Sequence, residues 1–440
     1  MAELEPLYTA DEMRAAEAGH DVDAMMQRAG AAVAEELMRR FPDARRIALH
    51  AGRGANGGDG RIAAEILCSR GREIVDDRPD VAIDALLGTG LEGAPREETS
   101  LLIERINGAG VPIVAVDIPS GVNASTGEVA GAAVRADVTV TMHGAKVGLA
   151  VAPGRFNAGV VVIADIGLES AATAHRLVTE EILERVPAKT GRDTKYTAGS
   201  VLVVGGSRGM SGAAALAARA AFRADAGYVA IAAPADSLPV LETLVLEAVK
   251  RPLDQVFDAV GRASALAIGP GLGRGEEAQA LVRRLLGETD VPAVVDADAL
   301  YELEPFEREA STVLTPHSGE LGRLLGEESS WVDAHRLEAL ARAVERFGCV
   351  VLLKGADTLV GAPGEAVLVR ETNTPGLATA GSGDVLTGIV AAFLSKGMDA
   401  PLAAAAAAAA QARAASLAGK PRGLVASDVI ETMPRALAGD

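Results

Sequence analysis

The stretch IALHAGRGANGGDGRIAAEIL, residues 47–67, decides the fold class of this chain. It begins with a short apolar run, IALHA, that is typical of a buried strand. A nine-residue loop that contains five glycines follows, and RIAAEIL then has the spacing of a helix. A strand, a glycine turn and a helix N-terminus together form an anion-binding unit. The stretch therefore predicts an α/β domain with a ligand site where the strand ends.

The glycine loop also fits a nucleotide-binding pattern. Gly52, Gly54 and Gly57 satisfy G-x-G-x-x-G, and Asp76 or Asp77 stands about 20 residues further on, where a dinucleotide fold places its ribose-binding acid. Any tight turn from a strand into a helix also needs glycines, so the pattern alone leaves nucleotide binding open.

Strands continue to alternate with helices through both halves of the chain. Two helices are predicted before residue 40, the first beginning with a capping box at Thr9–Glu12. Further apolar runs begin at residues 81, 112, 136, 160, 201, 228, 265, 292, 312 and 349. They predict two mostly parallel, doubly wound sheets, and two extended runs within 357–371 predict an edge hairpin. The polar segment 168–196 predicts a linker, so we expect domains at 1–187 and 188–440.

Composition limits the possible partners and the compartment. The 440 residues include 60 Asp and Glu against 42 Lys and Arg, a net charge of −18, which excludes nucleic acid and anionic membranes as partners. The start of the chain lacks a signal peptide, and the run Ala403–Ala410 ends at Gln411, short of the ~20 residues that span a bilayer. Cys68 and Cys349 lie far apart in apolar stretches, which predicts buried, reduced thiols and no disulfide. We therefore expect a cytoplasmic protein.

Oxygen-bearing side chains follow several strands of the first half. The carboxyl ends of parallel strands line one crevice, so Asn56, Asp84 and Ser120 could supply ligands to a hard cation. Asp84 and Asp117 could equally cap loops. Lys146 could face the same crevice, although solvated lysines are far commoner.

These motifs carry a family resemblance. GRGANGGDG, AIDALLGTGLEG, VAVDIPSGVNASTGE and GAKVGL together resemble the NAD(P)HX epimerase domain over about residues 5–168. The resemblance implies a Rossmann-like three-layer fold, interconversion of R and S hydrated nicotinamide cofactors, and a potassium ion held by Asn56, Asp84 and Ser120. Asp117 is implied to bind near the reacting carbon as a catalytic residue. The implied substrate-binding residues are Ala55, Asn56, Gly57, Gly58, Asp59, Gly88, Thr89, Gly90, Leu91, Glu92, Gly93, Ala94 and Asp117.

This half departs from the family pattern at two places. The family usually has a second Asn where this chain has Ala55. The stretch from Gly60 to Ile83 is also shorter than in the family, which predicts a missing strand and helix.

The second half has a glycine turn that feeds an apolar helix. In GLATAGSGDVLTGIVAAFL, the N–H groups of Gly381, Ser382 and Gly383 can converge on an oxyanion, and Asp384 can accept a hydroxyl proton. The simpler interpretation makes Asp384 a helix cap.

This turn and five other motifs resemble the ADP/ATP-dependent NAD(P)HX dehydratase of the ribokinase-like superfamily. The other motifs are GGSRGMSGAA at 205, AIGPGLG at 267, VVDADAL at 294, LTPHSGELGRLLG at 314 and LLKGADT at 352. The adenine nucleotide is implied to bind Lys354, Gly355, Ala356, Asp357, Thr358, Thr374, Pro375, Gly376, Leu377, Ala378, Thr379, Ala380, Gly381, Ser382 and Gly383. The hydrate is implied to bind Ala213, Gly273, Pro316, His317, Ser318, Gly319, Glu320, Leu321, Gly322 and Asp384, the last as the catalytic base. Thr194 stands where the family favours His.

Three polar residues of the second half keep two interpretations. His317 fits a hydrogen-bonded loop histidine better than a metal ligand or a general base, because no second His is near it in sequence. Asp296 and Asp298 could ligate magnesium or cap the next helix.

The two resemblances together imply a bifunctional NAD(P)H-hydrate repair enzyme. The expected cofactors are K⁺, Mg²⁺ and ADP or ATP as phosphoryl donor. The expected partners are NAD(P)HX and an adenine nucleotide, with neither nucleic acid nor membrane, in a homo-oligomer. A ribokinase-like small-alcohol kinase with an N-terminal nucleotide-binding module is one alternative, and a dehydrogenase built on the Gly52 loop is another.

Overall fold

The computed structural model describes residues 4–372 and 374–438. The chain divides into two compact α/β units. The unit called N-terminal here contains Pro6–Arg176 and the short segment Asp333–Arg336. The unit called C-terminal contains residues 4–5, Leu177–Val332 and residues 337–438.

The N-terminal unit is built on a six-stranded sheet of order β3-β2-β4-β5-β6-β7, with all neighbouring strands parallel. The strands are β2 (Arg46–Ala51), β3 (Glu73–Ile74), β4 (Val81–Ala85), β5 (Ile113–Val116), β6 (Val138–Met142) and β7 (Val160–Ala164). The helices are α1 (Ala10–Glu17), α2 (Val22–Arg40), α3 (Ala55–Ser69), α4 (Glu97–Asn107), α5 (Val147–Ala150) and α6 (Arg155–Ala158). The capping box predicted at Thr9–Glu12 is present at the start of α1.

Two apolar clusters place helices on both faces of this sheet. On one face, Val33 and Leu37 of α2 pack with the strand residues Ile47 and Ile83. On the other face, Ile103 of α4 and its neighbours pack with alanines of the strands. The predicted three-layer arrangement is confirmed. Between α3 and β4 the shortened stretch contains only the two-residue strand β3.

The C-terminal unit is built on the sheet of order β1-β8-β17-β16-β15-β14-β13-β12-β9-β10-β11. Its strands are β1 (Glu5–Leu7), β8 (His175–Leu177), β9 (Ser200–Val204), β10 (Tyr228–Ala233), β11 (Val249–Pro252), β12 (Ala265–Ile268), β13 (Ala293–Val295), β14 (Thr312–Leu314), β15 (Val350–Leu353), β16 (Asp357–Gly361) and β17 (Val367–Glu371). Strands β9 to β15 pair in parallel. The predicted hairpin is confirmed as the antiparallel pair β16 and β17. The division between the units falls within β1 and β8.

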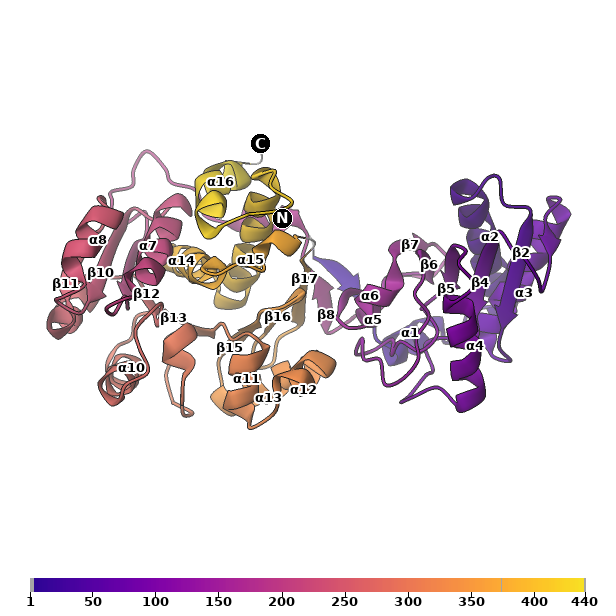
Figure 1. Cartoon of the computed structure of the whole chain (residues 1–440), viewed down its shortest axis with the longest axis horizontal. Helices are drawn as coiled ribbons and strands as arrows, with labels where there is room; N and C mark the ends of the chain where they lie inside the picture. Colours follow the sequence, from indigo (N-terminus) through magenta and orange to yellow (C-terminus); the bar gives the residue numbers. More distant parts are fainter. Residues whose placement is uncertain (1–3, 373, 439–440) are drawn as a thin grey trace. The chain divides into compact units, whose positions relative to one another are not determined.

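Helices cover this sheet, and those nearest to it are rich in alanine. The helices are α7 (Ser211–Arg223), α8 (Leu238–Leu244), α9 (Val256–Val260), α10 (Glu276–Glu288), α11 (Ser318–Leu325), α12 (Ser329–Ala334), α13 (Arg336–Phe347), α14 (Ser382–Ser395), α15 (Ala400–Leu417) and α16 (Ala426–Ala438). Short 3₁₀ turns are η1 (Glu180–Arg185), η2 (Leu253–Gln255), η3 (Ala297–Leu300) and η4 (Pro375–Leu377). Figure 1 shows α14 and α15 side by side beneath α16. A methyl group on Gly388 of α14 would lie 2.1 Å from the carbonyl oxygen of Ala217 in α7, so small residues permit this close packing.

The segment 168–196 is more ordered than a polar linker. It contains β8 and η1, and Val178, Ile182 and Leu183 are buried in the core of the C-terminal unit. Three apolar side chains spaced through a charged stretch are too weak a pattern to indicate this packing from sequence. The domain boundary at 187/188 remains a prediction about the two activities.

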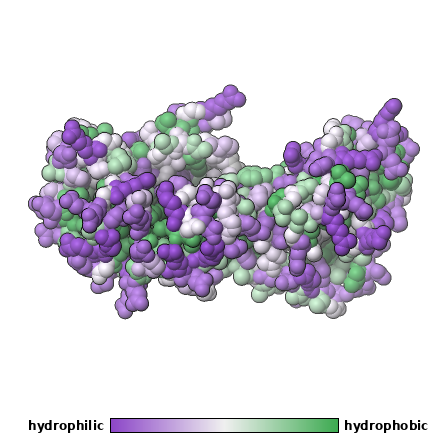
Figure 2. Space-filling view, turned by 60° about the horizontal axis from the view of Figure 1, so that its bottom comes forward, coloured by the Kyte–Doolittle hydropathy of each residue, from purple (hydrophilic) through white to green (hydrophobic). Residues whose placement is uncertain are grey.

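The structure also tests the predictions about membrane spans and about the two cysteines. Within the described residues, no helix is both long and apolar enough to cross a membrane, and the face drawn in Figure 2 is largely hydrophilic. The prediction of two buried thiols is wrong for Cys68, which is exposed near the end of α3. Cys349 is partly buried, and burial raises the pKa of its thiol to about 12.

Candidate functional site

The N-terminal unit has a pocket of about 820 Å³ at the carboxyl ends of its parallel strands. Predicted substrate residues that line it are Ala55, Asn56, Asp59, Gly88, Thr89, Gly90, Leu91, Glu92, Ala94 and Asp117. Gly57, Gly58 and Gly93 do not line it. The sequence therefore located the pocket, because strand ends on one edge of a parallel sheet converge.

The glycine loop lets the backbone approach itself closely beneath this pocket. A methyl group on Gly52 would lie 2.0 Å from the carbonyl oxygen of Leu86, and one on Gly57 would lie 2.1 Å from that of Gly52. Only glycine fits these two positions. The N-cap Gly54 provides no side-chain cap, so α3 begins at Ala55 with its first N–H groups directed to the pocket end of the helix.

A strained aspartate on the pocket wall is paired with a buried lysine that does not itself line the pocket. Asp117 lines the pocket and has a φ of 63°, a left-handed conformation that side-chain-bearing residues rarely adopt. Lys146 is 1% exposed, and its Nζ lies 2.5 Å from Asp117 Oδ1, 3.0 Å from Thr141 Oγ1 and 2.8 Å from the Met142 carbonyl oxygen. The alternative of a solvated Lys146 is wrong, because its ammonium is enclosed and fully engaged.

Two more acids lie near this pair. Burial raises the pKa of Asp59 to about 7, with further upward contributions from Asp117 and Glu17 and an opposing one from Lys146. Burial and the charge of Asp117 also raise the pKa of Glu17. Glu17, on α1, lines the pocket, and nothing in the sequence pattern singled it out.

The three predicted cation ligands come together around one backbone segment. Ser120 Oγ donates to Asp84 Oδ1 at 2.6 Å, and the Ser120 N–H donates to Asp84 Oδ2 at 2.8 Å. The Leu87 N–H donates to Ser120 Oγ at 2.9 Å, and Asn56 Nδ2 donates to the Leu87 carbonyl at 2.8 Å. Asp84 does more than cap a loop, because it is fully buried among strand ends.

Asn56 Oδ1 and the Asp84 carboxylate are buried without the positive charge that a bound cation would supply. Asn56 Oδ1 is buried and has no hydrogen-bond partner within the described part of the chain. Burial raises the pKa of Asp84 to about 6, despite the hydrogen bonds from Ser120 and Leu86 that lower it. An orphaned amide oxygen beside a buried carboxylate fits a cation site.

The C-terminal unit has a second polar centre where β13, β15 and α14 meet. Lys354 Nζ lies 2.7 Å from Asp296 Oδ1 and 3.8 Å from Glu320 Oε2. Thr387 Oγ1 donates to Asp296 Oδ2 at 2.7 Å. A methyl group on Gly383 would lie 3.4 Å from Lys354 Nζ, so the lysine stands directly beside the glycine turn. The sequence separated these residues by long stretches, and only the fold brings them together.

The turn positions Asp384 inside the first turn of a helix. Gly381 is the N-cap of α14, with a left-handed φ of 85°, and Asp384 follows it three residues later. Burial raises the pKa of Asp384 to about 7; the nearby Asp296 adds to the rise and Lys354 opposes it. Because the N-cap is Gly381, Asp384 is not the cap of this helix. Its position in the first turn still favours the ionised form through the helix dipole.

A ring of loops completes this centre. His317 is the N-cap of α11: its Nδ1 accepts from the Gly319 N–H at 3.0 Å, and its backbone N–H donates to the Glu320 carboxylate. The interpretation of His317 as a hydrogen-bonded loop histidine is confirmed. Asp298 accepts from the Gly273 N–H at 3.0 Å and from Arg274 Nε at 2.8 Å.

These contacts show which donors of the chain pair with Asp296 and Asp298. Asp296 is the N-cap residue of η3, yet its side chain makes no cap hydrogen bond and instead accepts from Lys354 and Thr387. Asp298 holds the Gly273 loop. Both carboxylates are therefore already paired with donors of the chain.

Comparison with known proteins matches both halves. A family model described as NAD(P)H-hydrate dehydratase matches residues 201–435. A model described as YjeF-related protein N-terminus matches residues 22–77 and 72–148. The bifunctional NAD(P)H-hydrate repair enzyme of Moorella thermoacetica is 35% identical over 94% of this chain and 92% of its own length. This chain belongs to the family of bifunctional NAD(P)H-hydrate repair enzymes.

Solved structures resemble the C-terminal part of this family member. The ADP/ATP-dependent NAD(P)H-hydrate dehydratase of Bacillus subtilis, co-crystallised with ATP/Mg²⁺, is 28% identical, with a TM-score of 0.56 over 61% of this chain and 99% of its own. A ribokinase-like superfamily protein of Enterococcus faecalis has a TM-score of 0.54 over 62% of this chain and 98% of its own. At 22% identity the second likeness concerns the fold alone. The predicted ribokinase-like fold is confirmed.

Two residues of the C-terminal centre were missed by the sequence analysis. Thr387 and Gln411 lie on α14 and α15 among small apolar residues. Gln411 Nε2 donates to the Ser382 carbonyl at 2.6 Å and so supports the glycine turn. A lone polar residue inside an apolar helix is the pattern that would have indicated such a buried contact. Among the predicted nucleotide residues, Asp357 and Thr358 are buried at the start of β16.

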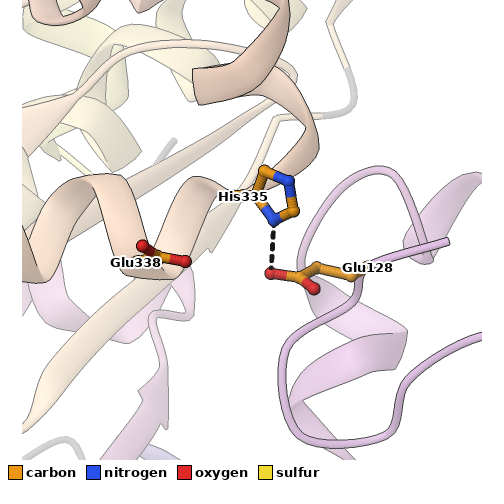
Figure 3. Close-up of side chains that lie close together, drawn as sticks. All are labelled: Glu128, His335 and Glu338. Carbon is orange, nitrogen blue, oxygen red and sulfur yellow. Dashed lines mark hydrogen bonds and ion pairs between the residues drawn. The ribbon is translucent and has the colours of Figure 1, made fainter. Parts of the chain in front are cut away.

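A histidine and a glutamate form a pair outside both centres. His335 Nδ1 lies 2.9 Å from Glu128 Oε1, and both residues belong to the N-terminal unit. Figure 3 shows the imidazole directed at the carboxylate, with Glu338 on the adjoining helix α13. Glu338 belongs to the C-terminal unit. One imidazole and one carboxylate are too few ligands for a metal centre.

Proposed function

We propose that this chain repairs hydrated nicotinamide cofactors. Its N-terminal pocket interconverts the R and S forms of NAD(P)HX, and its C-terminal centre dehydrates the S form to NAD(P)H at the expense of ADP or ATP. The observation that carries the proposal is that both regions matched by family models contain a built polar site: Asp117 with Lys146 in one, and Asp384 with Lys354 in the other.

The C-terminal centre fits phosphoryl transfer to a hydroxyl group. The N–H groups of the turn Gly381–Gly383 and the ammonium of Lys354 would hold phosphate oxygens, and Asp384 would accept the proton of the C6 hydroxyl as its oxygen attacks the terminal phosphorus. The ring nitrogen lone pair then expels phosphate, the C6–O bond breaks, and loss of a ring proton restores the dihydronicotinamide. A pKa of about 7 for Asp384 suits a base that works near neutral pH.

Magnesium is proposed to arrive with the nucleotide. Asp296 and Asp298 already accept hydrogen bonds from Lys354 and Arg274, so they do not form a free carboxylate set for a dedicated metal cage. Mg²⁺ keeps several waters and is commonly held by substrate phosphates. When bound there, it would neutralise charge on the transferred phosphoryl group.

Potassium is proposed at the Asn56, Asp84 and Ser120 cluster. The orphaned Asn56 Oδ1 and the buried Asp84 carboxylate support a cation, and one charged oxygen group among neutral ones suits a larger, weakly demanding ion better than magnesium. The ion would supply positive charge beneath the substrate loop. Homo-oligomeric assembly and a cytoplasmic location stay predictions.

Incubating the purified chain with mixed R and S NADHX tests the proposal. With ADP or ATP, the absorbance of regenerated NADH should account for both isomers; without nucleotide, the isomers should equilibrate and no NADH should form. Consumption of only one isomer would remove the epimerase assignment. A stable phosphorylated product from a small alcohol would favour the kinase alternative, and a redox change with an alcohol substrate would favour the dehydrogenase.

A further inference from the structure

Asp59 lies in the first turns of α3 and faces the N-terminal pocket. It lines the pocket wall, is 9% exposed, and its Oδ1 has no hydrogen-bond partner in the part of the chain that the structure describes. A buried carboxylate oxygen without a donor is costly when ionised. Asp59 is therefore poorly solvated and directed to the space where the substrate would bind.

The charges around Asp59 do not balance it. Three acids, Glu17 from α1, Asp59 from α3 and Asp117 from the end of β5, face one buried cation, Lys146. Lys146 is bound to Asp117 at 2.5 Å and to two further oxygens, so its hydrogen-bonding capacity is used. Among the described residues, no cationic side chain pairs with Asp59.

The other walls around Asp59 supply no compensating charge close by. Helix α2 contributes apolar side chains such as Met26 to the pocket, and the loop after β4 contributes Leu86 and Leu87. The remaining charged pocket residues, Arg53, Glu92 and Arg96, are exposed to solvent. Burial accordingly raises the pKa of Asp59 to about 7, so both protonation states are populated near neutral pH.

We propose that Asp59 carries the proton in epimerisation, protonating the C6 hydroxyl as it leaves and recovering the proton when water adds from the opposite face. The inference rests on the proposed epimerase function. In the first step the C6–O bond breaks, the proton moves from Asp59 to the leaving oxygen, and water and a ring iminium form. In the second step water adds to C6 on the other face, the iminium nitrogen recovers its lone pair, and the proton returns to Asp59. No oxidant or reductant is needed.

Lys146 and Asp117 have a different part in this scheme. The Asp117 carboxylate, oriented by Lys146, would face the positive ring during the step, whereas Asp59 exchanges the proton. The two acids differ because Asp117 has an ammonium partner, whereas Asp59 Oδ1 has no hydrogen-bond donor among the residues that the structure describes. Environment thus divides the carboxyl groups into a charge stabiliser and a proton carrier.

The test compares Asp59→Asn with Asp59→Glu in the full chain, with Glu65→Gln as the matched control. Glu65 lies on the same helix, exposed to solvent and outside the pocket lining. R-to-S conversion should fall by at least about a hundredfold in Asp59→Asn, recover in part in Asp59→Glu, and stay normal in Glu65→Gln. Dehydration of pure S isomer in the same preparations should be unchanged, which shows that the C-terminal unit is intact. A thermal unfolding curve equal to that of wild type shows that the N-terminal unit of each variant is folded as well.

The pH profile and isotope exchange give readouts that a structural role would not move. Because the protonated form of Asp59 starts the reaction, wild-type epimerisation should fall as pH rises through about 7, and the residual rate of Asp59→Asn should lose this dependence. Epimerisation in ¹⁸O-labelled water should place the label at C6. Full epimerase activity in Asp59→Asn, a flat wild-type profile, or no label at C6 would each overturn the inference. A wild-type chain that does not epimerise at all would instead overturn the proposed function.

Discussion

Replacing Asp384 by asparagine distinguishes a catalytic role of this residue from a structural one. If Asp384 is a buried general base, the variant should be more stable than wild type, whereas if Asp384 is structural, the variant should be less stable. Burial raises the pKa of Asp384 from 3.8 to about 7. One pKa unit corresponds to 1.36 kcal/mol, so an ionised Asp384 costs the folded state up to about 4 kcal/mol at pH 8. Asparagine has the same size and no charge, so Asp384→Asn should raise the melting temperature at that pH.

The pH dependence of this effect follows from the direction of the shift. A group whose pKa is raised by folding contributes its full stability below the unfolded pKa, near 4, and loses it as the pH rises through about 7. The stability difference between Asp384→Asn and wild type should therefore be larger at pH 8 than at pH 5. Thermal or urea unfolding at both pH values measures it.

The rate of dehydration should fall in Asp384→Asn, although the stability of the variant rises. Losing a general base costs about 10² to 10⁴ in rate, so kcat for dehydration of S-NADHX with ADP should fall at least about a hundredfold, about 3 kcal/mol of barrier. In wild type, kcat should rise with pH through about 7 as Asp384 loses its proton, and the variant should lack this rise. Following regenerated NADH by absorbance measures both.

Two results would refute this reasoning. A variant that melts earlier and loses activity only in proportion to its unfolded fraction would make Asp384 structural, and a folded variant with nearly full activity would remove it from the mechanism. Asp399→Asn is the matched control, because Asp399 is an exposed residue at the start of α15 whose side chain makes no cap hydrogen bond. Its kcat and melting temperature should equal those of wild type.

Three further changes test other parts of the molecule. Lys354→Gln should raise KM for ADP at least about tenfold and lower the free energy of unfolding by about 3–5 kcal/mol, since it leaves the buried Asp296 carboxylate without its cation. Initial rates at varied ADP would contradict this if KM stayed unchanged. Epimerisation should require potassium through Asn56, Asp84 and Ser120, so equal rates in potassium and in a potassium-free buffer of matched ionic strength would count against the site. A fragment 177–440 should melt higher than 188–440, because it retains the buried Val178, Ile182 and Leu183, each worth about 1.5–3 kcal/mol; equal melting temperatures would show that they do not stabilise the core.

The parts of the fold that sequence predicted are those with a local pattern. Strand runs, glycine loops and the capping box at Thr9–Glu12 depend on neighbours a few residues apart, and the structure contains them. Loops at the ends of parallel strands converge by geometry, which located the N-terminal pocket. The edge strands β1, β3 and β11 are short, and their apolar patterns are too brief to distinguish from loops.

Local sequence patterns could not predict ion pairs between residues that lie far apart in the sequence. Lys146 looks like any surface lysine until the fold encloses it against Asp117, and Lys354 meets Asp296 only because β15 and β13 end at the same sheet edge. The prediction that Cys68 is buried was wrong, because apolar neighbours in sequence do not determine which side of a helix faces solvent at its last turn. Burial is a property of the assembled layers.

Helix α15 presents nearly the same methyl surface in every direction. Ala403–Ala410 are buried all around its circumference, so turning the helix about its axis would exchange one alanine for another with little change in shape. Orientation must then come from side chains that differ, and Gln411, whose Nε2 donates a hydrogen bond to the Ser382 carbonyl, is one that also contacts the glycine turn. The side-chain amide of Gln411 thus links the angular position of a nearly uniform helix to the turn that precedes Asp384.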